Sequence, residues 1–410
     1  MVFMKIVRLV FYLLLLFATL SIGIVVGRKS IEGHKPPAGI YPANVGTATL
    51  KPGPWGSLTS LPITIAAPTE LLAVKKTEEN PVRWFFNGFT PAKLNDLLNS
   101  LNLPDSLRSR LTAPDKLEVS PSGLTLSPER DTVFALPPQA IEVIYRILAG
   151  AEENKYLKEI LPASKFELLA KTDGISSRTM SLLTQVSVKY GKNYFCFCLP
   201  YVLALIPTYE EKRLLMKEIS RQDTMLVKLW VAPGSDYRAL ANYWSRACWS
   251  TDVEALLESL AKTPGGGVLD IIELLPPLPT AQLYTFPVPQ NPLNGTPVKQ
   301  DCMWTSFNFF RDPPEPRFSN ANYILENLKQ DYYLVTSDPR YGDVVMFATP
   351  DKHFVHSAVY IADNIVFTKD GDNPLKPWKF STIDELLDIY SYSVPPDQNL
   401  TLYYFRNKYY

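Results

Sequence analysis

Proline is spread along the whole chain and constrains the fold more than any other feature of the sequence. The protein has 36 prolines in 410 residues, well above an average share of about 5%. Proline removes a backbone donor and breaks helix interiors, so long uninterrupted elements are disfavoured. We expect many short elements joined by loops, in a chain too long for a single growing core.

Charge composition excludes one class of partner. The chain carries 41 basic and 41 acidic residues, for a formal net charge of +0. Proteins that bind nucleic acid usually concentrate lysine and arginine on one face. We therefore expect no nucleic-acid partner.

An uncharged apolar run lies near the N-terminus, at residues 9–27 (LVFYLLLLFATLSIGIVVG), with basic residues on both sides. At roughly 1.5 Å per residue, a helix of this length just crosses the hydrocarbon core of a bilayer. We interpret residues 1–29 as a signal-anchor, with residues 9–27 in the membrane and the bulk of the chain exported, periplasmic or extracellular. A cleaved signal peptide is the alternative.

Composition and hydrophobic pattern divide the rest of the chain into three further segments. Residues 30–80 are rich in proline and glycine and predict a tether. Residues 81–279 predict a mainly helical domain of unknown role, with helices near 90–104, 137–150 and 250–267 and one hairpin at 117–129. Residues 280–410 form a domain of their own, in which one helix precedes several short β-branched and aromatic strands. This order is typical of an α+β fold.

Three of the four cysteines fit the interior of the protein. Cys196 and Cys198 lie in one apolar run that predicts a buried strand, and Cys248 lies beside a tryptophan. Two of the three histidines, His353 and His356, are three residues apart. On a strand they would point to opposite faces, so we expect no metal site, and no motif indicates a cofactor.

Cys302 has a different setting, in QDCMWTSFNFF (residues 300–310). Asp301 precedes it as a candidate helix cap, and the aromatic residues after it are compatible with a helix. A thiol nucleophile needs a base, because an ordinary cysteine with a pKa near 8.5 is mostly protonated at neutral pH. His356, on a predicted strand, is the candidate base.

The chain from residue 280 resembles the NlpC/P60 group of papain-like cysteine peptidases in three pieces. Asp301-Cys302 opens a helix as in the family's DC motif, YGDVVMF (residues 341–347) is similar to the strand that follows, and HSAVYIAD (residues 356–363) is similar to the histidine strand. The resemblance implies a papain-like domain, with a helix packed on a small antiparallel sheet. It also implies that Cys302 is the nucleophile and His356 the base, in hydrolysis of amide bonds of peptidoglycan peptides.

The position of the family's third catalytic residue, usually His, Asn or Gln, corresponds to Thr368. A threonine accepts an imidazole N–H but brings neither charge nor amide geometry. Lys369, Asp370 and Asn373 are close enough in sequence to support the site instead. Tyr284 is the candidate for the family's active-site tyrosine.

Two functions follow as expectations. The first is a membrane-tethered, exported cysteine hydrolase, with Cys302 and His356 as a dyad and a weak third member. Its substrate would be a peptide of the peptidoglycan type. The alternative is an inactive relative of the same fold that binds or scaffolds in the envelope. Other thiol chemistry on the same fold, such as acyl transfer, also stays open.

Overall fold

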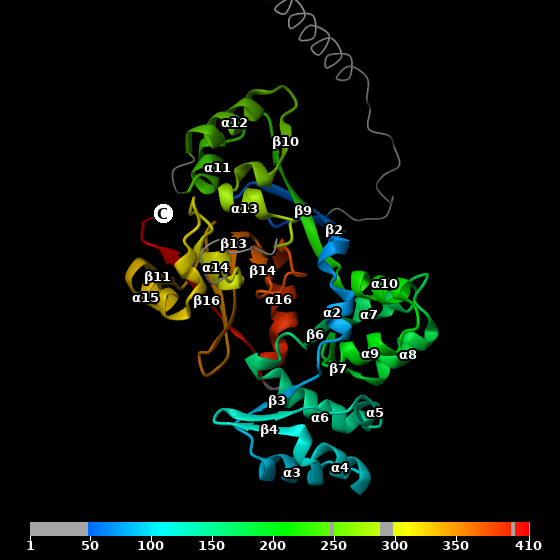
Figure 1. Ribbon diagram of the computed structural model, residues 1–410. Coiled ribbons are helices and arrows are strands. Elements are labelled where there is room, and N and C mark those ends of the chain that lie inside the picture. Colours follow the sequence, from blue (N-terminus) through cyan, green and yellow to red (C-terminus); the bar gives the residue numbers. More distant parts are fainter. Residues whose placement is uncertain (1–47, 247–249, 288–297, 395–397, 410) are drawn as a thin grey trace, which may run out of the picture. The chain divides into compact units, whose positions relative to one another are not determined.

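The computed structural model describes residues 48–246, 250–287, 298–394 and 398–409 (Figure 1). The expected N-terminal transmembrane helix has to be corrected. In these ranges no helix has the length and apolar character that a bilayer crossing requires. Residues 9–27 themselves, Cys248 and residues 30–47 of the predicted tether lie outside the described residues.

The α+β class is confirmed, with antiparallel sheets and short helices throughout the described chain. The helices before residue 288 are α2 (Val74–Glu78), α3 (Pro91–Ser100), α4 (Asp105–Leu111), α5 (Arg130–Phe134), α6 (Pro138–Ala149), α7 (Ala163–Leu169), α8 (Ser177–Gln185), α9 (Leu199–Leu205), α10 (Tyr209–Ser220), α11 (Tyr237–Trp244), α12 (Ser250–Lys262) and α13 (Pro277–Gln282). The later helices are α14 (Cys302–Phe307), α15 (Ala321–Asp331) and α16 (Ile383–Tyr390). Single 3-10 turns are η1 (Thr69–Leu71), η2 (Pro114–Lys116), η3 (Glu152–Asn154), η4 (Ile271–Leu274), η5 (Pro316–Ser319) and η6 (Ser391–Ser393).

The first antiparallel sheet joins segments that are far apart in the sequence. Its strands, in spatial order, are β1 (Ala48–Thr49), β2 (Ser57–Ile65), β9 (Gln222–Val231) and β10 (Gly267–Asp270). β2 pairs with β9 along its whole length, from Ser57 opposite Trp230 to Ile65 opposite Gln222. Part of the stretch predicted as a tether is therefore a strand of this sheet.

Helices account for more of the described residues between 81 and 279 than strands do, in line with the expected mainly helical region, but this part also contains sheets. Two small antiparallel sheets alternate with its helices. One has the order β3 (Trp84–Asn87), β5 (Gly123–Leu126), β4 (Leu117–Ser120). The other has the order β6 (Glu159–Pro162), β8 (Asn193–Cys196), β7 (Ser187–Tyr190). The hairpin predicted at 117–129 is β4 and β5.

The apolar run that holds two cysteines changes conformation halfway along. Cys196 ends β8, whereas Cys198 is the N-cap of α9, with Pro200 in its first turn. Proline is favoured there because the N–H that it lacks would have no partner within the helix. Both cysteines are buried, as predicted, but only Cys196 belongs to a strand.

The C-terminal part is built on an antiparallel sheet whose strands do not follow one another in sequence order, drawn in yellow to red in Figure 1. In the described chain its spatial order is β11 (Tyr332–Val335), β16 (Thr401–Asn407), β12 (Val344–Ala348), β13 (Phe354–Ala362), β14 (Ile365–Lys369) and β15 (Trp378–Thr382). α14 contacts β13 and β14 on one face of the sheet. Apolar residues of α16 pack against the other face, so β12 to β14 are buried on both sides.

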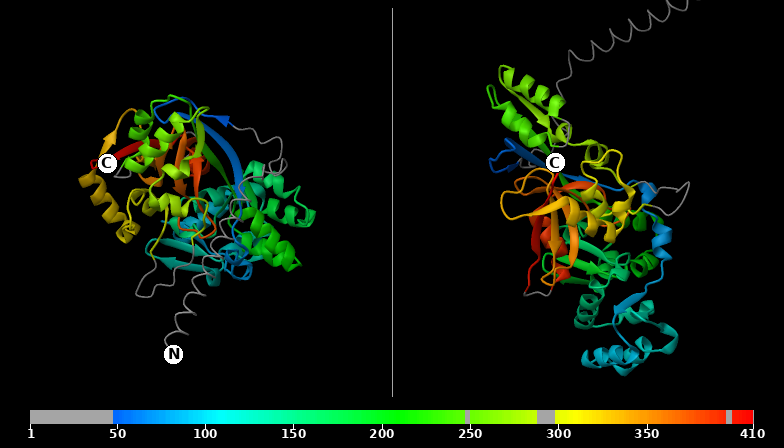
Figure 2. Two further views of the ribbon diagram at one scale, coloured as in Figure 1. Left: turned by 90° about the horizontal axis from the view of Figure 1, so that it is seen from above. Right: turned by 90° about the vertical axis from the view of Figure 1, so that its left-hand side faces the viewer.

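One hydrophobic core crosses from the first sheet into the C-terminal sheet. It includes Val227 and Leu229 of β9 together with Phe367 and Phe380 of β14 and β15. The Thr224 hydroxyl of β9 also donates to the Phe380 carbonyl at 2.8 Å. β9 contacts β15, and the left view of Figure 2 shows it, in green, beside the orange strands. β9 is thus in place to contribute side chains next to the C-terminal sheet.

Candidate active site

Cys302 is the first residue of α14, and Asp301 caps that helix. Asp301 has extended backbone angles, and its carboxylate accepts from the Trp304 N–H at 2.9 Å. This is the geometry of a preferred N-cap residue, so the local sequence determines where the helix begins. The side chain of Cys302 is half-buried.

The surroundings of Cys302 favour the neutral thiol. Burial raises its pKa to about 12, and the charges of Asp301 and Asp370 act in the same direction. Hydrogen bonding with the backbone and hydroxyl of Ser357 lowers the pKa, but by less. In the free protein at neutral pH, Cys302 is therefore a thiol rather than a thiolate.

His356 lies on β13 and is completely buried. Its Nε2 lies 2.8 Å from Oγ1 of Thr368, on the adjacent strand β14. The Thr368 hydroxyl donates its only proton to the Ser357 carbonyl, at 3.2 Å. Thr368 must therefore accept from His356, which places the ring proton on Nε2 and leaves a lone pair on Nδ1.

Aromatic side chains fix the plane of the His356 ring. Tyr390, at the end of α16, stacks on it with ring centroids 4.3 Å apart and planes inclined by 21°. Phe347, its partner residue on β12, lies at a centroid distance of 5.5 Å, next to an irregularity in the strand register. Burial lowers the pKa of His356 to about 4, so the ring is neutral at pH 7. Its Nδ1 has no hydrogen-bond partner among the described residues.

Cys302, at the start of α14, lies against Ser357, the residue next to His356 on β13, but no hydrogen bond joins Cys302 to His356 in the described structure. The thiol interacts with Ser357, the residue after His356. Adjacent residues of a strand point to opposite faces. Ser357 faces α14, where its hydroxyl lies 3.0 Å from that of Ser306, whereas His356 faces α16.

The other residues predicted to support the site have structural contacts. Tyr284 donates its hydroxyl proton to the Met225 carbonyl at 2.6 Å. Lys369 is buried and donates to the carbonyls of Gly371 and Asn373, at 2.6 and 3.2 Å. The Asn373 side chain accepts from the Leu375 N–H at 2.8 Å. These contacts leave Thr368 as the orienting partner of His356.

His353 is exposed in the turn before β13 and takes no part in this arrangement. Within the described ranges, no group of three histidine, cysteine, aspartate or glutamate side chains is placed to hold a metal ion.

A cleft of about 720 Å³ contains Cys302 in its lining. One part of its wall comes from residues 152–165, 189–193 and 221–223, and the other from residues 299–302, 370–379 and 385–392. Acidic and basic side chains are interspersed around it. Some are strongly desolvated: burial lowers the pKa of Lys165 to about 7 and that of Lys158 to about 8, and it raises the pKa of Glu159.

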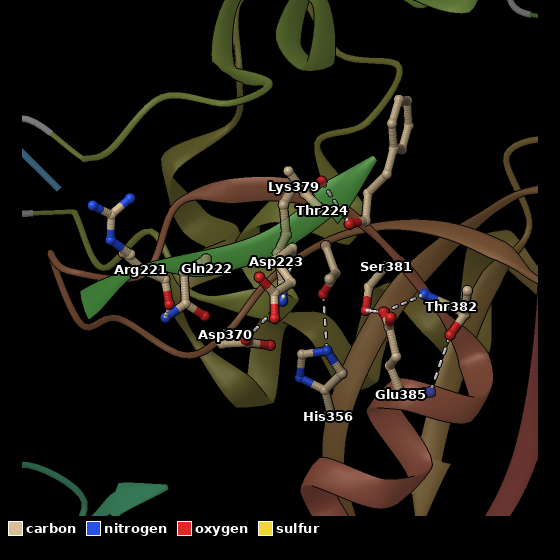
Figure 3. A network of polar contacts seen from close by, with 12 residues as sticks. Arg221, Gln222, Asp223, Thr224, His356, Asp370, Lys379, Ser381, Thr382 and Glu385 are labelled. Atoms are coloured by element: carbon tan, nitrogen blue, oxygen red, sulfur yellow. Dashed lines mark hydrogen bonds and ion pairs between the residues drawn. The ribbon is translucent and has the colours of Figure 1, made fainter. Parts of the chain in front are cut away.

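Figure 3 shows polar residues around His356 that the sequence did not identify. β9 brings Asp223 next to Lys379 of β15, whose ammonium donates to the Asp223 carbonyl oxygen at 3.4 Å. Lys379 also lies 3.8 Å from the carboxylate of Asp370. Sequence reasoning missed Asp223, Lys379 and Tyr390 because only tertiary contacts bring them here. Asp370 is different, because the sequence already indicated it as possible support for the site, two residues after Thr368.

Comparison with known proteins gave no matching family model, no matching curated protein and no matching solved structure, so the function is argued from the geometry of this site.

Proposed function

We propose that the protein is a cysteine hydrolase that cleaves an amide bond, with Cys302 as nucleophile and His356 as general base. The observation that carries this proposal is the bond from His356 Nε2 to Thr368, because it leaves Nδ1 as a free, correctly deprotonated acceptor. A general base must have an available lone pair in its resting state.

The proposed reaction has two halves. His356 Nδ1 takes the proton of the Cys302 thiol as the sulfur attacks the carbonyl carbon of the amide. The imidazolium then gives that proton to the departing amine, and a thioester remains on Cys302. Water hydrolyses the thioester in the second half, again with His356 accepting and returning a proton.

The protonation states favour one form of this mechanism. A thiol with a pKa of about 12 and an imidazole with a pKa of about 4 do not form a resting ion pair. Proton transfer must then accompany the attack on the substrate. The Sγ atom lies with Ser357 on the face of β13 opposite to His356, so the mechanism requires the first turn of α14 to shift toward Nδ1 before the sulfur attacks.

The cleft supports a charged peptide as substrate. Desolvated ammonium and carboxylate groups gain most when a ligand supplies the opposite charge. Lys158, Lys165 and Glu159 offer both signs within the cleft that contains Cys302. Peptidoglycan peptides carry carboxylates and amino groups, and they are the substrates that the resemblance to the NlpC/P60 group implies.

One observation favours a second function, an inactive binding protein of the same fold. The polar contacts of the Cys302 thiol go to Ser357 rather than to His356, and its pKa is high. A charged peptide could then bind in the cleft without being cleaved.

Digestion of purified peptidoglycan by the full chain distinguishes the two. We expect new amino and carboxyl termini, detected by mass spectrometry, with the wild type and with the control variant His353→Gln. We expect none with Cys302→Ala or His356→Gln. Binding of the peptides by the wild type without cleavage would support the second function instead.

A further inference from the structure

Asp370 follows β14 and has an unsatisfied carboxylate. Its Oδ1 is buried and has no hydrogen-bond partner among the described residues. Its Oδ2 lies 3.8 Å from the ammonium of Lys379, a distance for charge attraction rather than a good hydrogen bond. Buried carboxylate oxygens are normally hydrogen-bonded, so this one requires an explanation.

The second unsatisfied atom at this place is Nδ1 of His356. Asp370 and His356 influence each other electrostatically, and Figure 3 shows the carboxylate on the side of the ring that carries Nδ1. In the tautomer that Thr368 selects, Nδ1 is an acceptor, and an ionised carboxylate is also only an acceptor. Two acceptors cannot bond to each other, but a proton arriving on Nδ1 would give both of them a favourable partner.

We propose that Asp370 is a positioning residue that stabilises the protonated form of His356 while the reaction proceeds. This inference rests on the proposed function, because it is the Cys302 thiol that supplies the proton. During attack the S–H bond breaks and an N–H bond forms at Nδ1. Asp370 takes no proton itself and stays negatively charged until His356 passes the proton to the departing amine.

The charges around Asp370 come from every element that packs here. Burial raises the pKa of Asp370, but the charges of Lys379, His356, Lys376 and Lys369 outweigh burial and lower it, so the carboxylate is ionised. For His356, burial lowers the pKa, Asp370 raises it and Lys379 lowers it further. Further titratable neighbours are Tyr390 of α16, Tyr392 of η6, Cys302 of α14 and Asp223 of β9.

Histidine titration in the full chain tests the proposal directly. The chain has only three histidines, so the ring nitrogens of His356 can be followed by NMR after selective isotope labelling. We expect the Nε2–H tautomer at pH 7. We expect Asp370→Asn to lower the pH at which His356 takes a proton by about one unit or more, because a close opposite charge has an effect of that size.

Three further variants sharpen the comparison. Asp370→Glu keeps the negative charge, so His356 in this variant should take its proton at nearly the same pH as in the wild type. Asp372→Asn removes a carboxylate two residues away that pairs with Lys155, and it should leave the His356 titration nearly unchanged. Lys379→Met removes the opposing charge and should raise the pKa of His356, which keeps the test decisive if Asp370→Asn does not fold.

Alkylation of Cys302 by iodoacetamide at pH 7 is the second readout. Asp370→Asn should slow it through the loss of imidazolium stabilisation, an effect partly offset because the Asp370 charge also raises the pKa of the Cys302 thiol, whereas Asp370→Glu should restore the wild-type rate. Equal titration and equal alkylation in the wild type and Asp370→Asn would overturn the proposal, as would an unchanged titration in Lys379→Met. If Asp370→Asn shifts the titration but His356→Gln leaves alkylation unchanged, the coupling of Asp370 to His356 stands and the proposed function fails.

Discussion

At the scale of single residues, the site depends on which proton each polar atom holds. Thr368 has one hydroxyl proton and gives it to Ser357, so it can only accept from His356. A neutral hydroxyl can therefore fix the tautomer of a histidine without the charge of an aspartate. It cannot stabilise the imidazolium as a charge would, and we assign that part to Asp370.

Replacing Thr368 tests its role in fixing the tautomer of His356, separately from the role proposed for Asp370. Thr368→Val keeps the shape but removes the acceptor of the buried His356 N–H and one donor to the Ser357 carbonyl. We expect a loss of about 1–3 kcal/mol in the free energy of unfolding. We also expect the amide-hydrolysis rate to fall at least about tenfold, because a general base contributes two or more decades only when it is correctly placed. Thr368→Ser should preserve both values, measured by urea unfolding and by peptide digestion.

The buried imidazole also predicts how stability depends on pH. The pKa of His356 is about 4 in the folded state and near 6.5 in an unfolded chain. The unfolded state therefore binds the extra proton first, so this contribution is complete above pH 6.5 and is lost as the pH falls toward 4. The loss is about 3 kcal/mol at 1.36 kcal/mol per pH unit.

Urea unfolding at pH 7.5 and pH 4.5 measures that loss. His356→Gln should show a smaller difference between the two pH values than the wild type, and His353→Gln should behave like the wild type. The same pH dependence in all three proteins would show that His356 is not the group responsible.

At the scale of elements, the local pieces of the site were predictable and their long-range pairing was not. Asp301 before an aromatic run predicts a capped helix, and the β-branched stretches predict β12, β13 and β14. These patterns depend on neighbours in the sequence. The pairing of β2 with β9 depends on side-chain packing between segments more than 150 residues apart, as between Ser57 and Trp230, and no local pattern carries that information.

α16 illustrates how an element holds a site residue that sequence reasoning missed. Its N-terminus has a capping box, in which Thr382 accepts from the Glu385 N–H at 3.1 Å and Glu385 accepts from the Thr382 N–H at 3.0 Å. Tyr390, the last residue of the helix, stacks on His356. The cap thus stabilises α16, the helix whose Tyr390 holds the ring of His356 in place.

Weakening that cap should lower the stability of α16. Thr382→Ala should reduce the free energy of unfolding by about 1 kcal/mol and speed amide hydrogen exchange in α16, while Thr382→Ser should restore both. Exchange in α16 that is unchanged in Thr382→Ala would contradict the role of the cap.

At the scale of the whole molecule, the region before residue 280 and the C-terminal sheet share one core. Polar contacts reinforce it: Tyr243 donates to the Ile361 carbonyl at 2.7 Å, and Tyr341 donates to the Leu274 carbonyl at 3.2 Å. Asp343, completely buried, forms ion pairs with Arg406 at 2.7 Å and with Arg246 at 3.4 Å. The sequence indicated a boundary near residue 280 because prolines cluster there, but composition does not reveal which surfaces pack together.

The buried carboxylate of Asp343 allows a test of this shared core. Asp343→Asn removes the buried counter-charge of Arg406 and one ionic partner of Arg246, and it should lower the free energy of unfolding by about 3–5 kcal/mol. The change should lower the stability of β9 and of the C-terminal sheet together, as followed by hydrogen exchange. Glu254→Gln, in a largely exposed pair with Arg238, should have little effect. Destabilisation confined to the C-terminal sheet would contradict a common core.

The rate of Cys302 alkylation, located by mass spectrometry and compared between the wild type and His356→Gln, tests the central claim most directly. If His356 acts as the base for Cys302, we expect iodoacetamide at pH 7 to label Cys302 at least about tenfold more slowly in the variant. His353→Gln should match the wild type, and the buried Cys196 and Cys198 should react slowly in all three proteins. Equal labelling of Cys302 with and without the His356 imidazole would contradict the account.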